Sequence, residues 1–182
     1  MNRRSASQLG AIAFVAFLGC IPLANWMIGH VGTVCAPDGP CLIPVAPGLL
    51  APSCVLVVGL ALVLRDVVQR CLGTAMGLLA IAVGTASSML VAPAQLALAS
   101  GIAFLLSELS DFAVYTPLQR RRLVLAVAAS AMTGLVVDSA VFLYLAFGNL
   151  AYLPGQVVGK AWAVLVSLPL VRLLRRMAPT PA

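Results

Sequence analysis

The chain has 182 residues, of which 62% are hydrophobic and only 9% are charged, and its mean hydropathy is +1.09. Because soluble domains carry roughly 25% charged residues, this composition excludes an ordinary soluble domain and predicts an all-α integral membrane protein. The formal net charge of +6 does not indicate nucleic-acid binding, since ten of the eleven basic residues lie at the ends of apolar segments and the basic residues are not interleaved with aromatic residues.

The apolar segments predict six membrane-spanning helices in one transmembrane domain, residues 1–182, because about 20 apolar residues cross a bilayer. The predicted spans are residues 8–28, 48–68, 72–92, 95–117, 123–147 and 155–176. Arginines gather before the first span, between spans two and three, between spans four and five, and at the end of span six. The alternate loops at 29–47, 93–94 and 148–154 contain no Lys or Arg. This alternation predicts six spans with both termini in the cytoplasm.

The first outer loop, residues 29–47, is rich in Gly and Pro, and we expect no long regular structure in it. It contains Cys35 and Cys41, which are either a small disulfide in an oxidising compartment or two free thiols. The only histidine, His30, lies in this loop, and we read it as a solvated residue rather than a ligand. We therefore expect no metal site and no cofactor.

Ionisable residues within or near the spans are the candidates for a functional site. They are Asp66, Glu108, Asp111, Asp138 and Lys160. A charge at the centre of a membrane helix costs about 2.5–3.5 kcal/mol, so each of these residues needs a partner, a hydrated cavity or a function. Asp66 lies four residues before Arg70, and an ion pair at the membrane interface accounts for Asp66 as well as a function does.

Glu108 and Asp111 lie three residues apart in the fourth predicted span, so they share one helix face, which Tyr115 continues one turn further on. Two adjacent carboxylates repel each other in a low dielectric and need a partner or a raised pKa. They form either a structural network between helices or the inner wall of a polar cavity, and we favour the cavity. A third reading, an intramembrane enzyme with this pair as acid and base, lacks any HExxH or GxSxG motif, so we expect no enzyme.

Asp138 in the fifth span and Lys160 in the sixth are predicted at similar depth, where they can form an ion pair. Gln156 lies one turn from Lys160 on the same face. The excess of acceptors suits cations, protons or a ligand with N–H donors. A guanine-like base fits, because its ring N–H and exocyclic amine can both face one carboxylate while the amide of Gln156 or Asn25 contacts its carbonyl edge. A purely structural ion pair is the alternative.

Four stretches of the chain resemble the vitamin uptake transporter (VUT) family, the queuosine precursor transporters: "GLALVLRDVVQRCLG" (59–73), "SELSDFAVYTPLQRRR" (107–122), "VVDSAVFLYLAFG" (136–148) and "GQVVGK" (155–160). The resemblance implies a fold similar to the S-components of energy-coupling-factor transporters. It also implies import of 7-cyano-7-deazaguanine or its aminomethyl relative across the bacterial inner membrane. The positions that it marks are Asp66, Asp111, Asp138, Gln156 and Lys160.

This chain departs from the resemblance at one position. Many members carry a glutamate after the aspartate of span two, whereas this chain has Gln69 and Arg70, and a second acid appears at Glu108 instead. Because a carboxylate is lost at this position, the departure affects the expected substrate more than the expected fold.

The sequence therefore predicts a multi-pass importer of a small nucleobase-like molecule, held between spans four, five and six by Glu108, Asp111, Asp138 and Gln156. The alternative is a substrate-binding subunit for another vitamin that depends on a separate energising ATPase module, since the chain has no P-loop. The expected partners are the substrate, the lipid membrane, and either an energising module or a second copy of the chain, but no nucleic acid.

Overall fold

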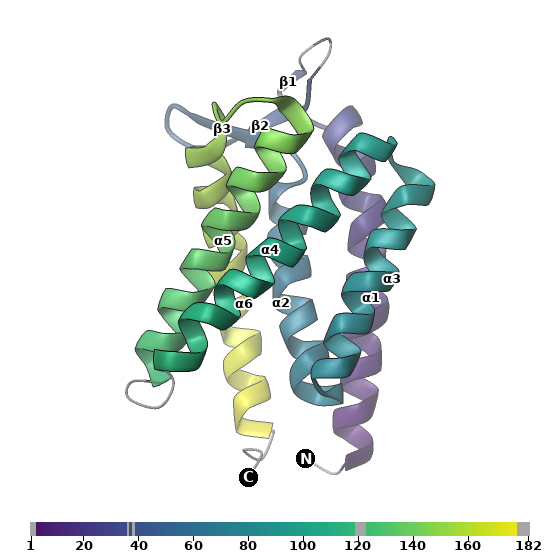
Figure 1. Ribbon diagram of the computed structural model, residues 1–182, viewed down its shortest axis with the longest axis vertical. Coiled ribbons are helices and arrows are strands. Elements are labelled where there is room, and N and C mark those ends of the chain that lie inside the picture. Colours follow the sequence, from purple (N-terminus) through teal and green to yellow (C-terminus); the bar gives the residue numbers. More distant parts are fainter. Residues whose placement is uncertain (1–2, 36, 38, 119–122, 178–182) are drawn as a thin grey trace.

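The computed structural model of the protein describes residues 3–35, 37, 39–118 and 123–177. Within these residues it contains six helices: α1 (Arg3–His30), α2 (Val55–Leu72), α3 (Thr74–Val91), α4 (Ala94–Leu118), α5 (Leu123–Phe147) and α6 (Leu153–Met177). The helices form one elongated bundle in which the start of α1 and the end of α6 lie at the same, lower end (Figure 1). Five of the six helices occupy the predicted segments to within a few residues. The largest difference among these five is at the start of α1, which begins at Arg3 rather than at residue 8.

Helix α2 differs from its prediction, because it begins at Val55 rather than at residue 48. The preceding residues belong to a three-stranded antiparallel sheet of β1 (Val34–Cys35), β2 (Cys41–Ala46) and β3 (Leu49–Pro52), in the order β1-β2-β3. The expectation for the outer loop did not include this sheet of short strands, and the predicted start of the second span is wrong. Two apolar runs flank Pro47 and Gly48, and Gly48 has a positive φ of 72°, which is the pattern of a tight hairpin turn.

A disulfide between Cys35 and Cys41 joins β1 to β2 at positions that face each other in the sheet register. The two cysteines were predicted to be either a disulfide or two free thiols, and in the structure they form the disulfide. The sheet lies over the upper ends of α1 and α6 (Figure 1). Ser53, directly after β3, donates a 2.7 Å hydrogen bond to the carbonyl of Met27 in α1, and Trp162 of α6 donates one of 3.2 Å to the carbonyl of Val45. The sheet is thus anchored to two helices.

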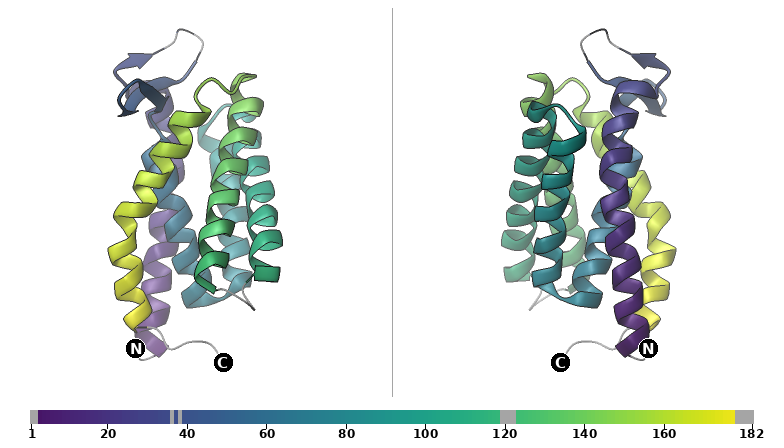
Figure 2. Two further views of the ribbon diagram at one scale, coloured as in Figure 1. Left: turned by 90° about the vertical axis from the view of Figure 1, so that its left-hand side faces the viewer. Right: turned by 90° about the vertical axis from the view of Figure 1, so that its right-hand side faces the viewer.

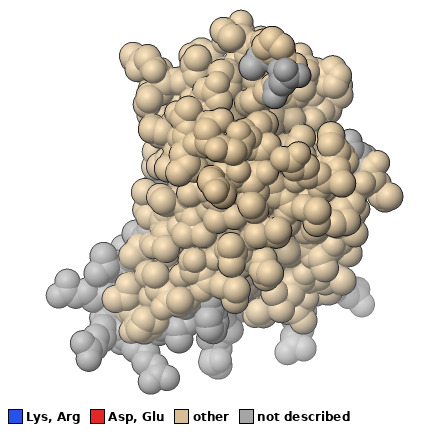
Figure 3. Space-filling model, turned by 45° about the horizontal axis from the view of Figure 1, so that its top comes forward, with Lys and Arg blue, Asp and Glu red and all other residues tan. Residues whose placement is uncertain are grey.

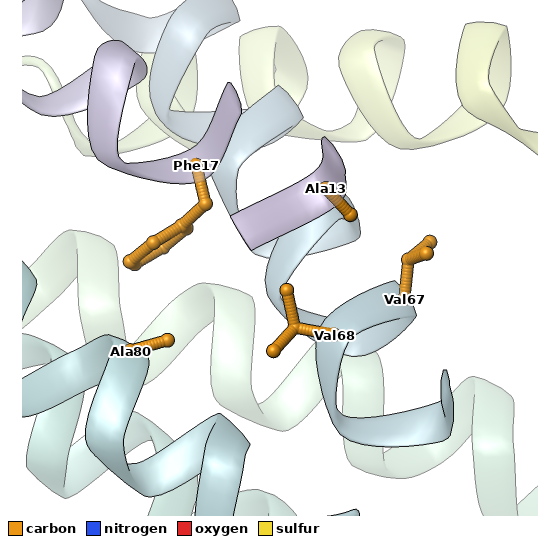
Figure 4. Close-up of a cluster of buried hydrophobic side chains, with 5 residues drawn as sticks. All are labelled: Ala13, Phe17, Val67, Val68 and Ala80. Carbon is orange, nitrogen blue, oxygen red and sulfur yellow. The ribbon is translucent and has the colours of Figure 1, made fainter. Parts of the chain in front are cut away.

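The helices pack as two groups. An apolar cluster of Ala13 and Phe17 from α1, Val67 and Val68 from α2, and Ala80 from α3 joins the first three helices (Figure 4), and α6 packs along α2. Helices α4 and α5 lie side by side along their length as a hairpin (Figure 2). Each group has its own closely packed contacts, and α3 and α6 connect the two.

Helices α4 and α5 approach each other at Gly134, whose missing side chain leaves room for Ser107. The Ser107 hydroxyl donates a 2.9 Å hydrogen bond to the carbonyl of Gly134. A Cβ atom at Gly134 would lie 3.2 Å from that hydroxyl oxygen, so a side chain there would press against α4. This glycine therefore supports the close packing of the hairpin.

By length and composition, two helical segments of the described chain could cross a membrane, Ala6–His30 and Ala129–Phe147. The segments Thr74–Leu90 and Leu153–Val166 are also apolar but shorter. Large apolar side chains are exposed on every helix, including Ile12, Val15, Leu60, Leu78, Leu90, Leu105, Met132 and Val166. Figure 3 shows no described Lys, Arg, Asp or Glu on the face that it displays, which includes the upper end. Such an apolar surface fits lipid rather than water.

Candidate functional site

A cavity of about 120 Å³ lies inside the upper half of the bundle, and residues from all six helices line it. We call it the central pocket. Its lining residues are Phe17, Cys20, Ile21, Ala24, Asn25, Cys54, Val55, Val58, Ala61, Leu62, Ile81, Gly84, Thr85, Ser88, Ser100, Gly101, Phe104, Asp138, Phe142, Gln156 and Lys160. Mostly apolar walls with a few convergent polar groups are typical of a small-molecule binding pocket.

An ion pair between α5 and α6 forms one wall of the pocket. The Nζ atom of Lys160 lies 2.5 Å from Oδ2 of Asp138 and donates a 2.9 Å hydrogen bond to Oγ of Ser139. Lys160 is 1% exposed and Asp138 is 6% exposed. The predicted pairing of these two residues is confirmed. Because both charges are removed from water, each depends on the other for its stabilisation.

Close packing of α6 on α2 brings Lys160 to the pocket. A Cβ atom at Gly59 of α2 would lie 2.5 Å from Cβ of Ala163 and 3.3 Å from Cα of Lys160. Only a glycine at this position allows the two helix backbones to approach this closely. The sequence thus positions the buried lysine through a small residue on the neighbouring helix.

Gln156 lies on the Lys160 face of α6, and its side chain is buried, with 1% exposure. Its amide oxygen, Oε1, has no hydrogen-bond partner among the described residues. A buried acceptor without a partner costs about 1–3 kcal/mol. Since Gln156 lines the pocket, a ligand with an N–H group could satisfy this oxygen.

Asn25 of α1 lies on another wall of the pocket. Its Nδ2 atom donates to the carbonyl of Ile21 at 2.9 Å and to Oγ of Ser88 in α3 at 3.1 Å. Because both hydrogens of the amide are used, only its oxygen remains to accept a hydrogen bond from a ligand. The structure therefore brings Asn25 to the same pocket as Asp138, Gln156 and Lys160.

Glu108 and Asp111 are not among the described residues that line this pocket. Glu108 forms an ion pair with Arg65 of α2. Asp111 faces α5, where its Cβ would lie 3.6 Å from a Cβ atom at Gly134. Glu108 and Asp111 therefore point to different neighbouring helices. The side chains of Asp66 and Tyr115 lie outside the described residues, as does the predicted pair of Asp66 with Arg70.

Some pocket residues were not predicted, although their polarity could have indicated them. Thr85 and Ser88 are two of the few hydroxyl residues in the third predicted span, and both line the pocket. Phe104 and Phe142 are aromatic lining residues whose role no spacing rule indicates, because aromatic side chains are common in any helix core. Within the described part of the chain, no group of three or more His, Cys, Asp or Glu could hold a metal ion.

Residues 87–181, more than half of the chain, match the model of a family described as "putative vitamin uptake transporter". The chain belongs to the vitamin uptake transporter family. The predicted resemblance to this family is thereby confirmed. The stretches 107–122, 136–148 and 155–160 lie within the match, and the stretch 59–73 lies before it. Neither a curated protein nor a solved structure gives a significant match to the chain.

Membership of the vitamin uptake transporter family makes this chain a membrane protein of a transport family. The matched region runs from the last turn of α3 to α6 and contains Asp138, Gln156 and Lys160. Asn25 and Arg65 come from helices that lie before the match. Of these two, Asn25 lines the central pocket, which thus combines polar groups from inside and outside the matched region.

Proposed function

We propose that this protein imports a small nucleobase-like molecule and binds it in the central pocket. The queuosine precursors 7-cyano-7-deazaguanine and 7-aminomethyl-7-deazaguanine are the substrates that we favour. The observation that carries the proposal is the buried Asp138–Lys160 pair beside the unpartnered amide oxygen of Gln156, in the pocket of a transport-family protein.

The polar groups of the pocket match the hydrogen-bonding edge of such a base. One oxygen of Asp138 accepts from Lys160, which leaves the other oxygen for a ligand N–H. Gln156 and Asn25 each offer an amide oxygen as acceptor. Lys160 uses two hydrogens on Asp138 and Ser139, and the third can be donated to a ligand carbonyl. Several acceptors and one donor suit a guanine-like edge with a ring N–H, an exocyclic amine and a carbonyl.

The volume of the pocket limits the ligand. An engineered protein cavity of about 150 Å³ holds benzene, so a cavity of this class accommodates about one ring. The central pocket, at about 120 Å³, is smaller than the roughly 300–1,000 Å³ of most ligand pockets. A compact, flat heterocycle is therefore favoured over a vitamin with long substituents, and a two-ring base requires the walls to move apart slightly.

For the membrane topology, we propose six spans in the bacterial inner membrane with both termini in the cytoplasm. Three observations support this orientation. Arginines gather at the lower helix ends, the displayed upper face shows no described charged residue, and the Cys35–Cys41 disulfide lies at the upper end. A disulfide suits the oxidising periplasm, and basic residues suit the cytoplasm.

Ligand binding to the purified protein tests the substrate assignment. We expect 7-cyano-7-deazaguanine to raise the midpoint of thermal unfolding in detergent, because a ligand at 100 times its Kd stabilises the folded state by about 2.7 kcal/mol. Adenine, which presents a different donor and acceptor edge, is the matched control and should give no shift. If neither deazaguanine raises the midpoint and another vitamin does, the alternative of a binding subunit for that vitamin replaces this proposal.

A further inference from the structure

A second ion pair lies one helical turn below the central pocket. Arg65 of α2 and Glu108 of α4 form this pair, and their side chains are 11% and 19% exposed. The last pocket-lining residue of α2 is Leu62, three residues before Arg65, and the last one of α4 is Phe104, four residues before Glu108. Because residues three or four apart lie one turn apart on one face, the pair lies directly below the pocket.

The ring of Phe104 connects the pair to the pocket. The guanidinium carbon of Arg65 lies 6.0 Å from the centroid of this ring, a distance at which a cation is attracted to an aromatic face. Phe104 also contacts Phe17 of α1, with ring centroids 6.4 Å apart. Phe104 is the lowest lining residue of α4, and Arg65 and Glu108 lie one turn below it. We call these three side chains together the floor.

In the floor, side chains from the two groups of helices meet, because Arg65 belongs to α2 and Glu108 to α4. The apolar cluster around Phe17 and Val68 closes the space between α1, α2 and α3 (Figure 4). Helices α2 and α4 do not pack along each other within the described chain, and the long side chains of Arg65 and Glu108 span the distance between them. Such side chains can part without disrupting an apolar core.

We infer that Arg65 and Glu108 are the inner gate of the pocket. While the pair is formed, the pocket is closed toward the arginine-rich helix ends, and its separation opens a path to that side. The remaining exposure of both side chains means that water can solvate the two charges as they separate, which lowers the cost of opening. This inference rests on the proposed import function and adds a conformational step to it.

Two native thiols can report on the gate. Cys20 and Cys54 line the pocket and are buried, with exposures of 7% and 3%. A charged, membrane-impermeant methanethiosulfonate reagent reaches them only when the pocket opens. The test uses the full chain in membrane vesicles of both orientations, with Cys71 replaced by serine, and compares the intact pair with Arg65→Gln/Glu108→Gln and with the charge-reversed Arg65→Glu/Glu108→Arg.

We expect the neutral double variant to be modified about tenfold faster from the arginine-rich side only, which is a shift of about 1.4 kcal/mol in the equilibrium between closed and open gate. The charge-reversed variant should return to the slow rate, because it restores the attraction. An unchanged rate, equal acceleration from both sides, or a fast charge-reversed variant would overturn the inference. The labelling test needs no ligand, so the two proposals can fail separately. If the labelling rates show a gate but the protein does not import deazaguanines, only the proposed substrate is contradicted. If the protein imports deazaguanines but the labelling rates show no gate, only this inference is contradicted.

Discussion

Replacing Lys160 alone by methionine is expected to destabilise the protein by about 3–5 kcal/mol, because Asp138 would remain as a buried carboxylate without a counterion. The 2.5 Å contact between the two side chains and the 1% exposure of Lys160 support an effect of this size. Unfolding by heat or denaturant in mild detergent measures it. A loss much smaller than 1 kcal/mol would contradict the description of this pair as buried and mutually dependent.

The double variant Asp138→Leu/Lys160→Met separates the structural role of the pair from its role in binding. A buried ion pair replaced by apolar residues of similar size is often neutral or stabilising, so we expect most of the lost stability to return. Ligand binding and uptake should not return, because the carboxylate that accepts the ligand N–H is gone. A stable double variant that still imports its substrate would show that the pair is purely structural.

Replacing Gln156 by leucine is expected to change stability and binding in opposite directions. The Gln156 oxygen is buried without a partner among the described residues, so removing it should stabilise the ligand-free protein by up to about 1–3 kcal/mol. The same change removes an acceptor for the ligand and should raise Kd at least about tenfold, or 1.4 kcal/mol. Thermal unfolding and ligand titration on the same purified sample measure the two effects.

Gln69→Leu is the matched control for Gln156→Leu. Gln69 is a partly buried glutamine of α2 that does not line the pocket, so its replacement should leave Kd unchanged. If Gln156→Leu lowers stability while keeping Kd, the amide of Gln156 is a structural group and does not contact the ligand. That outcome would remove one of the acceptors on which the substrate assignment depends.

The helices could be predicted because hydropathy and length alone determine where an apolar segment begins and ends. Hydropathy could not distinguish the sheet from a helix, since β3 is as apolar as α2, which follows it. The residues of β3 were therefore included in the predicted second span. Pro47 and Gly48 between two apolar runs were the available signal for a hairpin. The sheet was thus not predicted, because these turn residues were taken as a sign that the outer loop has no long regular structure.

The candidate site was predictable where partners come from consecutive helices. Asp138 and Lys160 lie on α5 and α6, which a short loop connects, so counting residues from that loop gives both depths. Arg65 and Glu108 lie on α2 and α4, which are not consecutive helices. The spacing of residues within one helix does not show which distant helix a given side chain faces, so this pair could not be predicted. Likewise, Glu108 and Asp111 share a face by spacing, yet they differ in direction by about 60°, since each residue turns the helix by about 100°. That angle is enough for them to meet different neighbours.

The most direct measurement of the central claim is uptake in bacteria that can neither make nor import queuosine precursors. The cells would express this protein, receive 7-cyano-7-deazaguanine at low concentration, and be assayed for queuosine in their tRNA. The wild-type chain should restore the modification, and the stable Asp138→Leu/Lys160→Met variant should not. No restoration by a wild-type chain that is inserted in the membrane would contradict the assignment of a deazaguanine substrate to the central pocket.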